Sequence, residues 1–243
     1  MHSEYHKWHS PALGHEMELK VYGHYGQPIM IFPAQAGRFY DYEGFGMVDA
    51  LSGYLEAGRI KLFCVDGIDS QSWTNKGIPP ADRARRHNDY DAYIMHEAVS
   101  FVRKNTGLRT MWLSGCSMGA LHSANFFFKY PETFDGLIAL SGLYQVGGFV
   151  GDHGGMDAYY NSPLWYLPNL TDHAKLEAYR RNKIVFAVGQ GRWEEECIHD
   201  TREMQRVLHQ KGVYATFDYW GHDVDHDWPW WRKMMPHQLD RLL

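Results

Sequence analysis

The sequence predicts an α/β fold in which helices cover both faces of a mostly parallel central sheet. Short, predominantly apolar runs such as 28–32 and 183–188 are typical of strands buried on both faces. Segments with helical periodicity alternate with these runs, and that alternation builds parallel sheets. In addition, the sequence Gly-Cys-Ser-Met-Gly at 115–119 lies where one apolar run meets the next helical segment.

The predicted strands are of two kinds. The first alternates polar and apolar side chains, as an antiparallel strand with one covered face does, and most of the later ones are continuous apolar runs. The predicted strands are 16–22, 28–32, 60–65, 110–114, 137–140, 183–188 and 214–219.

The predicted helices repeat apolar side chains at helical spacing, and two of them stop at a glycine, Gly58 and Gly212. They are 45–57, 89–105, 118–129, 199–211 and 229–243. In two longer stretches the apolar side chains show no clear helical or strand spacing. The charged segment 66–88 is expected to be a loop, and the Gly-, Tyr- and Trp-rich segment 143–180 is expected to be a cap-like insertion over a cleft. No linker or repeat divides the chain, so 1–243 is predicted to be one domain.

Composition excludes several classes of protein. Of the 243 residues, 44% are hydrophobic and 22% charged, and the net charge is −5, with lysine and arginine scattered. Nothing therefore indicates binding to nucleic acid or to an anionic membrane. The polar N-terminus and the lack of a long apolar run predict a cytoplasmic protein. Cys64, Cys116 and Cys197 are too few and too far apart for a disulfide framework or a zinc knuckle.

The Gly-Cys-Ser-Met-Gly sequence has the G-x-S-x-G spacing of a nucleophile elbow, and it sits between a strand and a helix as an elbow must. Glycines two residues on either side of Ser117 would let the turn pass close to the neighbouring strand and helix. The same five-residue motif can occur by chance in an ordinary glycine-rich turn, but the strand–turn–helix context favours a nucleophile. Cys116 is a weaker candidate because it is off the centre of the motif.

A serine hydroxyl needs a base to remove its proton and a carboxylate to orient that base. In open α/β sheets the loops after the strands meet at one edge, so the late loops should supply both groups. For the base we favour His226, before the closing helix, over His222. For the acid we favour Glu194, and the alternatives are Glu195, Glu196 and Asp200. Asp200 has another explanation, because the helix dipole favours a carboxylate near a helix N-terminus.

An oxyanion hole needs N–H donors aimed at the developing charge. Met118 follows the nucleophile and should supply one donor. The 33–37 loop should supply the other, from Gln35 or, as the alternative, Ala36. The Asp and His residues of 221–228 could suggest a metal site, but ligands from a single loop are weak evidence. We therefore expect no metal and no cofactor.

Four sequences resemble the esterase-D-type "putative esterase" family of α/β-hydrolases, whose relatives include S-formylglutathione hydrolases, feruloyl and acetyl-xylan esterases and mycolyltransferases. They are Gly-Cys-Ser-Met-Gly at 115–119, Phe-Pro-Ala-Gln-Ala-Gly at 32–37, Ser-Trp at 72–73 and His-Asp-Trp-Pro-Trp-Trp at 226–231. The resemblance implies an α/β-hydrolase fold with Ser117 as nucleophile, His226 as base and Met118 as oxyanion donor. Many relatives carry an aspartate where this chain has Gly189-Gln-Gly-Arg-Trp-Glu, and some carry a glutamate.

The predicted function is hydrolysis of small carboxylic esters through a covalent acyl-enzyme, with Trp73, Tyr40 and 143–180 shaping the pocket. Two alternatives stay open: acyl transfer to an alcohol at the same site, and a binding protein that keeps the fold without activity. A homo-oligomer is compatible with the sequence.

Overall fold

The computed structural model describes residues 1–243 and contains one eight-stranded sheet with the strand order β1-β2-β4-β3-β5-β6-β7-β8. Pairing of β1 with β2 and of β2 with β4 is antiparallel, and every other pairing is parallel. The strands are β1 Ser3–Ser10, β2 His15–Tyr22, β3 Gln27–Phe32, β4 Ile60–Val65, β5 Met111–Cys116, β6 Phe134–Leu140, β7 Lys183–Val188 and β8 Thr216–Tyr219. The predicted fold class is confirmed.

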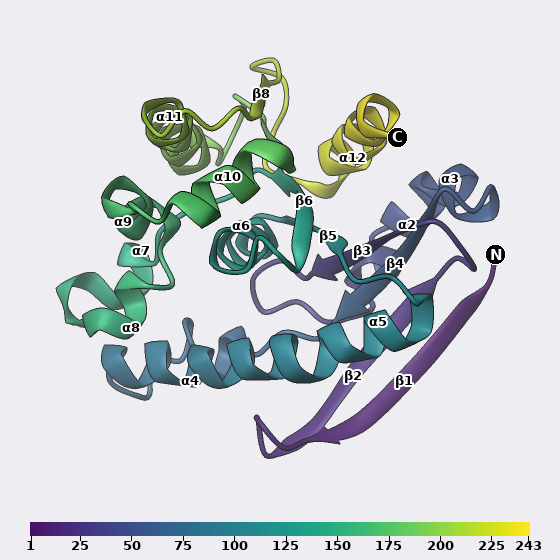
Figure 1. Cartoon of the computed structure of the whole chain (residues 1–243), viewed down its shortest axis with the longest axis horizontal. Coiled ribbons are helices and arrows are strands. Elements are labelled where there is room, and N and C mark those ends of the chain that lie inside the picture. The colour runs from purple at the N-terminus through teal and green to yellow at the C-terminus, as the bar shows by residue number, and fades with distance from the viewer.

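Helices cover both faces of the sheet (Figure 1). One apolar core joins the sheet to α4, α5, α6, α10 and α11, and a second joins its other face to α1–α3 and α12. The helices are α1 Asp41–Gly44, α2 Met47–Ala50, α3 Ser52–Glu56, α4 Pro80–Tyr93, α5 Val99–Thr106, α6 Met118–Lys129, α7 Gly147–Val150, α8 Gly155–Tyr159, α9 Pro163–Tyr166, α10 His173–Arg181, α11 Glu195–Gln210 and α12 Trp228–Leu242, with a π-helical turn at Ile94–Ala98. None of these helices has the length and apolar character needed to cross a bilayer.

The N-terminal strand β1 was not predicted. Its side chains alternate between exposed and half-buried, and most are polar, because it forms the edge of the sheet. Trp8 provides its apolar contact, stacking on Tyr93 and Phe101 with ring centroids 5.9 Å apart in both cases. Charged edge strands limit pairing with other chains, and the same charges hide the strand from a search for apolar runs.

Three helical predictions were wrong in their boundaries. The helix expected at 45–57 is broken into short turns, one break being at Gly46, whose φ of 76° is left-handed. The helix expected at 89–105 begins nine residues earlier, at Pro80, because a proline suits the first helical position. The helix expected at 199–211 begins at Glu195. The segment 143–180, expected to be irregular, contains the four short helices α7–α10.

Candidate active site

Ser117 occupies the turn between β5 and α6, where its backbone has φ 57° and ψ −120°. The two flanking glycines make this turn feasible. A Cβ atom on Gly115 would lie 2.5 Å from the carbonyl carbon of Gly119, and one on Gly119 would lie 2.3 Å from the carbonyl oxygen of Phe32. Neither contact is tolerable, so only glycine at both positions lets the helix approach the strands and present Ser117 at the sheet edge.

Strained backbone is confined to this edge of the molecule. The chain has four non-glycine residues with positive φ, and each lies in the loop that follows one of four parallel strands. They are Ala36 after β3, Ser117 after β5, Ser141 after β6 and Trp193 after β7. Such conformations cost about 1–3 kcal/mol each and persist where surrounding structure enforces them, often at functional sites.

The imidazole of His226 lies beside the serine hydroxyl, with Nε2 2.9 Å from Ser117 Oγ. Its loop, which precedes α12, is fixed to the loop after β7: the His226 N–H donates to the carbonyl oxygen of Arg192 at 3.0 Å. Asp225 adds an ion pair to Arg192, and the hydrogen bonds from that residue lower the pKa of the Asp225 carboxyl group. His222, the alternative base, is exposed and makes no hydrogen bond to Ser117.

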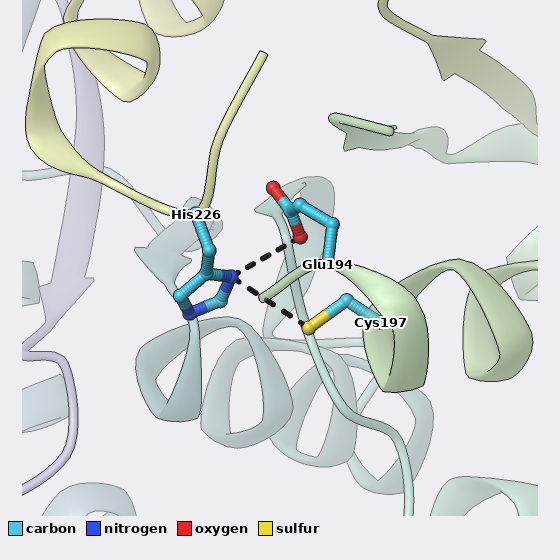
Figure 2. Close-up of side chains that lie close together, drawn as sticks. All are labelled: Glu194, Cys197 and His226. Carbon is cyan, nitrogen blue, oxygen red and sulfur yellow. Dashed lines mark hydrogen bonds and ion pairs between the residues drawn. The ribbon is translucent and has the colours of Figure 1, made fainter. Parts of the chain in front are cut away.

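Glu194, the residue before α11, completes a line of hydrogen bonds that begins at Ser117, and Figure 2 shows its contact with His226. Its Oε2 lies 3.1 Å from His226 Nδ1, and the glutamate is fully buried. The other carboxylate oxygen accepts hydrogen bonds from Ser141 Oγ at 2.6 Å and from the Gly189 N–H at 3.3 Å. Ser141 in turn accepts from Trp231 Nε1 at 3.0 Å. A buried carboxylate held by two donors is placed to orient the imidazole.

The other three acid candidates make no hydrogen bond to the His226 imidazole. Glu195 and Glu196 are exposed in the first turn of α11. Asp200 is buried, and it accepts a hydrogen bond from the Tyr144 N–H at 2.8 Å rather than from the imidazole. Cys116 is also buried, on the face of the sheet that packs against Tyr42, and burial raises the pKa of its thiol. The structure therefore brings together Ser117, His226 and Glu194.

Sequence reasoning missed Ser141 and Trp231 as parts of this arrangement. Ser141 directly follows β6 and thus lies at the same edge as the other loops, which is a signal the sequence does contain. Trp231 gives no such signal, since its indole N–H reaches Ser141 only because α12 packs across the sheet.

Replacing Ser141 with alanine is expected to lower kcat about tenfold and to destabilise the fold by about 1–3 kcal/mol, because one donor to the buried Glu194 is lost and the Trp231 N–H is left unpaired. The measurements are ester hydrolysis and urea unfolding. Ser10→Ala is the matched control, since Ser10 is a buried serine that donates to Glu97 at 2.7 Å, far from the site. Ser10→Ala should lower stability and leave kcat unchanged. Equal kcat values for the two variants would contradict the role of Ser141 as a donor to the catalytic glutamate.

Two adjoining cavities lie at this edge of the sheet, and the nucleophile lines the smaller one. One, of about 400 Å³, is lined by Ser117, His226, Cys197 and Trp193, and the other, of about 660 Å³, includes Gln35. Both are also lined by Leu143, Glu195 and Glu196. Most lining side chains are polar, and the segment 143–180 supplies part of the larger cavity. The remaining lining residues of the larger cavity are Gln145, Gly148, Phe149, His199 and Asp200.

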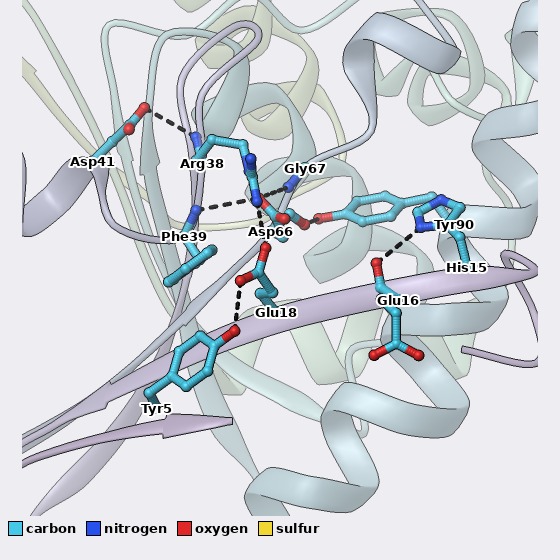
Figure 3. A network of polar contacts seen from close by, with 10 residues as sticks. All are labelled: Tyr5, His15, Glu16, Glu18, Arg38, Phe39, Asp41, Asp66, Gly67 and Tyr90. Carbon is cyan, nitrogen blue, oxygen red and sulfur yellow. Dashed lines mark hydrogen bonds and ion pairs between the residues drawn. The ribbon is translucent and has the colours of Figure 1, made fainter. Parts of the chain in front are cut away.

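The two predicted oxyanion donors belong to different elements. Met118 is the first residue of α6, so its N–H has no acceptor within the helix. Gln35 lies on the loop after β3, which a polar network anchors (Figure 3). Arg38 donates to Asp66 at 2.7 Å and to Glu18 at 2.5 Å, and its own N–H donates to Asp41 at 3.1 Å. These contacts fix the loop that carries Gln35 against β2 and β4.

The two residues predicted to contact substrate do not line either cavity. Trp73 is only 1% exposed and shares a small apolar cluster with Met118 and Leu121 of α6, so it packs beneath the helix that begins at the nucleophile. Tyr40 is 46% exposed and stacks edge-on against Phe39.

Comparison with known proteins identifies the family. A family model described as "Putative esterase" matches residues 10–242. A search of curated proteins gave no match. A ferulic acid esterase is similar in structure, with a TM-score of 0.77 and 14% sequence identity over 98% of this chain and 95% of that chain.

Two bacterial structures have TM-scores close to that of the ferulic acid esterase. The S-formylglutathione hydrolase FrmB from Staphylococcus aureus has a TM-score of 0.72 and 16% identity over 98% of this chain and 96% of its own. MPT51 (FbpC1) from Mycobacterium tuberculosis has a TM-score of 0.75 and 13% identity over 99% and 97%. Structural similarity at this identity shows a shared fold, and the family match covers nearly the whole chain. The chain therefore belongs to the "Putative esterase" family and is an ester-hydrolysing serine hydrolase with the α/β-hydrolase fold.

Proposed function

We propose that the protein hydrolyses small carboxylic esters through a covalent acyl-enzyme on Ser117, with His226 as general base and Glu194 as the orienting acid. One observation carries the proposal: the line of hydrogen bonds from Ser117 Oγ to His226 Nε2, at 2.9 Å, and from His226 Nδ1 to Glu194 Oε2, at 3.1 Å. This is the donor and acceptor order that activates an alcohol as nucleophile.

In the first half-reaction, Ser117 Oγ attacks the ester carbonyl carbon while His226 Nε2 takes the hydroxyl proton. Glu194 accepts the hydrogen bond from Nδ1–H, which keeps the ring in the required tautomer and stabilises the imidazolium. The carbonyl oxygen becomes an oxyanion and accepts hydrogen bonds from the backbone N–H groups of Met118 and Gln35. Oxyanion donors of this kind contribute roughly 3–4 kcal/mol each.

This tetrahedral intermediate collapses to the acyl-enzyme on Ser117 Oγ, and His226 gives its proton to the departing alcohol, which completes the first half-reaction. In the second half-reaction water enters, loses a proton to His226 Nε2 and attacks the acyl carbon. Collapse of the second intermediate returns the proton to Ser117 Oγ and releases the acid. The segment 143–180 is proposed to act as a cap, because Leu143 borders both cavities and Gln145, Gly148 and Phe149 line the larger one.

The test follows p-nitrophenyl acetate hydrolysis with and without added methanol, quantifying nitrophenol, free acetate and methyl acetate. Hydrolysis predicts one acetate for each nitrophenol without methanol, and acetate as the main product when methanol is present. Methyl acetate as nearly the sole product, with no free acetate under either condition, would mean that the site performs acyl transfer. No release of nitrophenol above background would indicate a binding protein.

A further inference from the structure

A thiol lies beside the proposed catalytic pair, and the mechanism above does not use it. Cys197 Sγ is 3.8 Å from His226 Nδ1, the same nitrogen that faces Glu194 Oε2 at 3.1 Å. The sulfur, nitrogen and carboxylate oxygen all lie within 4.8 Å of one another. Figure 2 shows the glutamate and the cysteine at the start of α11, both directed toward the imidazole ring.

The local fold explains this convergence. Glu194 immediately precedes α11 and Cys197 is three residues later, so their side chains share one face of the first helical turn. His226 approaches that face from the loop before α12, held by its backbone hydrogen bond to Arg192. Two of the three groups are therefore on one rigid element, and the third is held in place by the neighbouring loop.

The separations suit a metal ion. Zinc binds thiolate at about 2.3 Å and imidazole nitrogen or carboxylate oxygen at about 2.0–2.2 Å, so tetrahedral ligand atoms lie roughly 3.3–3.6 Å apart. The observed 3.1 Å and 3.8 Å lie within a few tenths of an ångström of that range. Cys197 and His226 also line the cavity of about 400 Å³ beside Ser117, which provides an entry path and room for water as a fourth ligand.

We propose that Glu194, Cys197 and His226 form a binding site for a thiophilic divalent cation, represented by Zn²⁺ or Cd²⁺, and that occupation of this site reversibly inhibits the enzyme. Sulfur, nitrogen and oxygen donors together favour such ions over Mg²⁺ or Ca²⁺, which prefer oxygen ligands only. The inhibition rests on the proposed ester hydrolysis, whereas the binding does not.

Metal binding would disable catalysis through the histidine tautomer. A bound ion displaces the thiol proton to solvent and coordinates His226 Nδ1, so the single proton of the neutral ring moves from Nδ1 to Nε2. That proton then faces Ser117 Oγ, so the ring can no longer accept the serine proton. A chelator would remove the ion and restore the active tautomer.

Binding is tested first, with Cd²⁺ and the Ser117→Ala protein, which keeps all three ligands and needs no activity. Titration should produce the ultraviolet thiolate-to-cadmium charge-transfer band and saturate at one ion per chain. The band should vanish in Ser117→Ala/Cys197→Ser and persist in Ser117→Ala/Cys64→Ala, whose missing thiol is buried elsewhere in the core. No band in the parent protein, or a band that survives loss of Cys197, would overturn the site.

Inhibition is tested by titrating Zn²⁺ during p-nitrophenyl acetate hydrolysis, with each variant normalised to its own metal-free rate. Cys197→Ser should raise the half-inhibitory Zn²⁺ concentration about tenfold or more, because a hydroxyl is a poor zinc ligand. Cys64→Ala should leave it unchanged, and excess chelator should restore the rate. Equal zinc sensitivity with and without Cys197 would contradict the proposal. If Cys197→Ser fails to fold, Cys197→Ala takes its place in the same titration. Because the cadmium titration needs no catalysis, loss of the proposed function would not be mistaken for loss of the site.

Discussion

Ser117→Ala is expected to lower kcat/KM for p-nitrophenyl acetate by about 10⁶, since removal of the nucleophile from a serine triad costs an effect of that order in kcat. The variant should fold, because alanine keeps the same Cβ atom at the strained position with φ 57°. Rate measurements on wild type and variant, with thermal unfolding to verify the fold, provide the test.

Ser123→Ala is the matched control for this substitution. Ser123 lies on α6, the helix that follows Ser117, and its hydroxyl donates to the Gly119 carbonyl oxygen at 2.8 Å instead of contacting His226. Its rate should stay near that of wild type. An alanine variant at 117 that keeps more than about one hundredth of the activity would exclude Ser117 as the nucleophile, because unassisted attack by water is far slower than that.

Glu194→Gln is expected to lower kcat by about 10⁴, the loss seen when the carboxylate of a serine-protease triad becomes an amide. The amide N–H₂ can donate to His226 Nδ1, which places the ring proton on Nε2 and directs it at Ser117. The geometry is then retained with the wrong tautomer. The measurement is steady-state hydrolysis, in which kcat should fall far more than KM changes.

Two further variants make the choice of acid decisive. Glu203→Gln removes a half-buried carboxylate from α11, where it pairs with Arg206 away from His226, and should leave kcat unchanged. Asp200→Asn removes a buried carboxylate that accepts from the Tyr144 N–H, so it should reduce stability more than catalysis. A larger loss of kcat in Asp200→Asn than in Glu194→Gln would show that Asp200 is the acid.

The sequence carries enough information for the α/β architecture because buried parallel strands are locally apolar. The run Lys183–Val188 and the helix Met118–Lys129 occur within the bounds expected from their patterns. The elbow was also predictable, since its glycines are required by contacts that any tight strand-to-helix turn makes. The edge strand β1 was not, because its half-buried side chains other than Trp8 are polar and its stabilising partners are distant in sequence.

The choice among late-loop residues depends on three-dimensional packing. Glu194, Glu195 and Glu196 are adjacent and chemically alike, and only the start of α11 decides that Glu194 is buried while the next two are exposed. The location of Trp73 beneath α6 likewise depends on how the loop after β4 folds back. The approach of Cys197 to His226 joins the first turn of α11 to a loop that follows 29 residues later in the sequence.

The central claim is that His226 activates Ser117, and covalent labelling with a fluorophosphonate probe tests it most directly. Intact-mass and peptide-mapping mass spectrometry should find one adduct per chain, on Ser117, with no labelling of Ser117→Ala. Labelling of His226→Ala should be at least about a hundredfold slower, since a general base contributes roughly 10²–10⁴ in rate. Labelling at another residue, or at an undiminished rate without His226, would contradict the account.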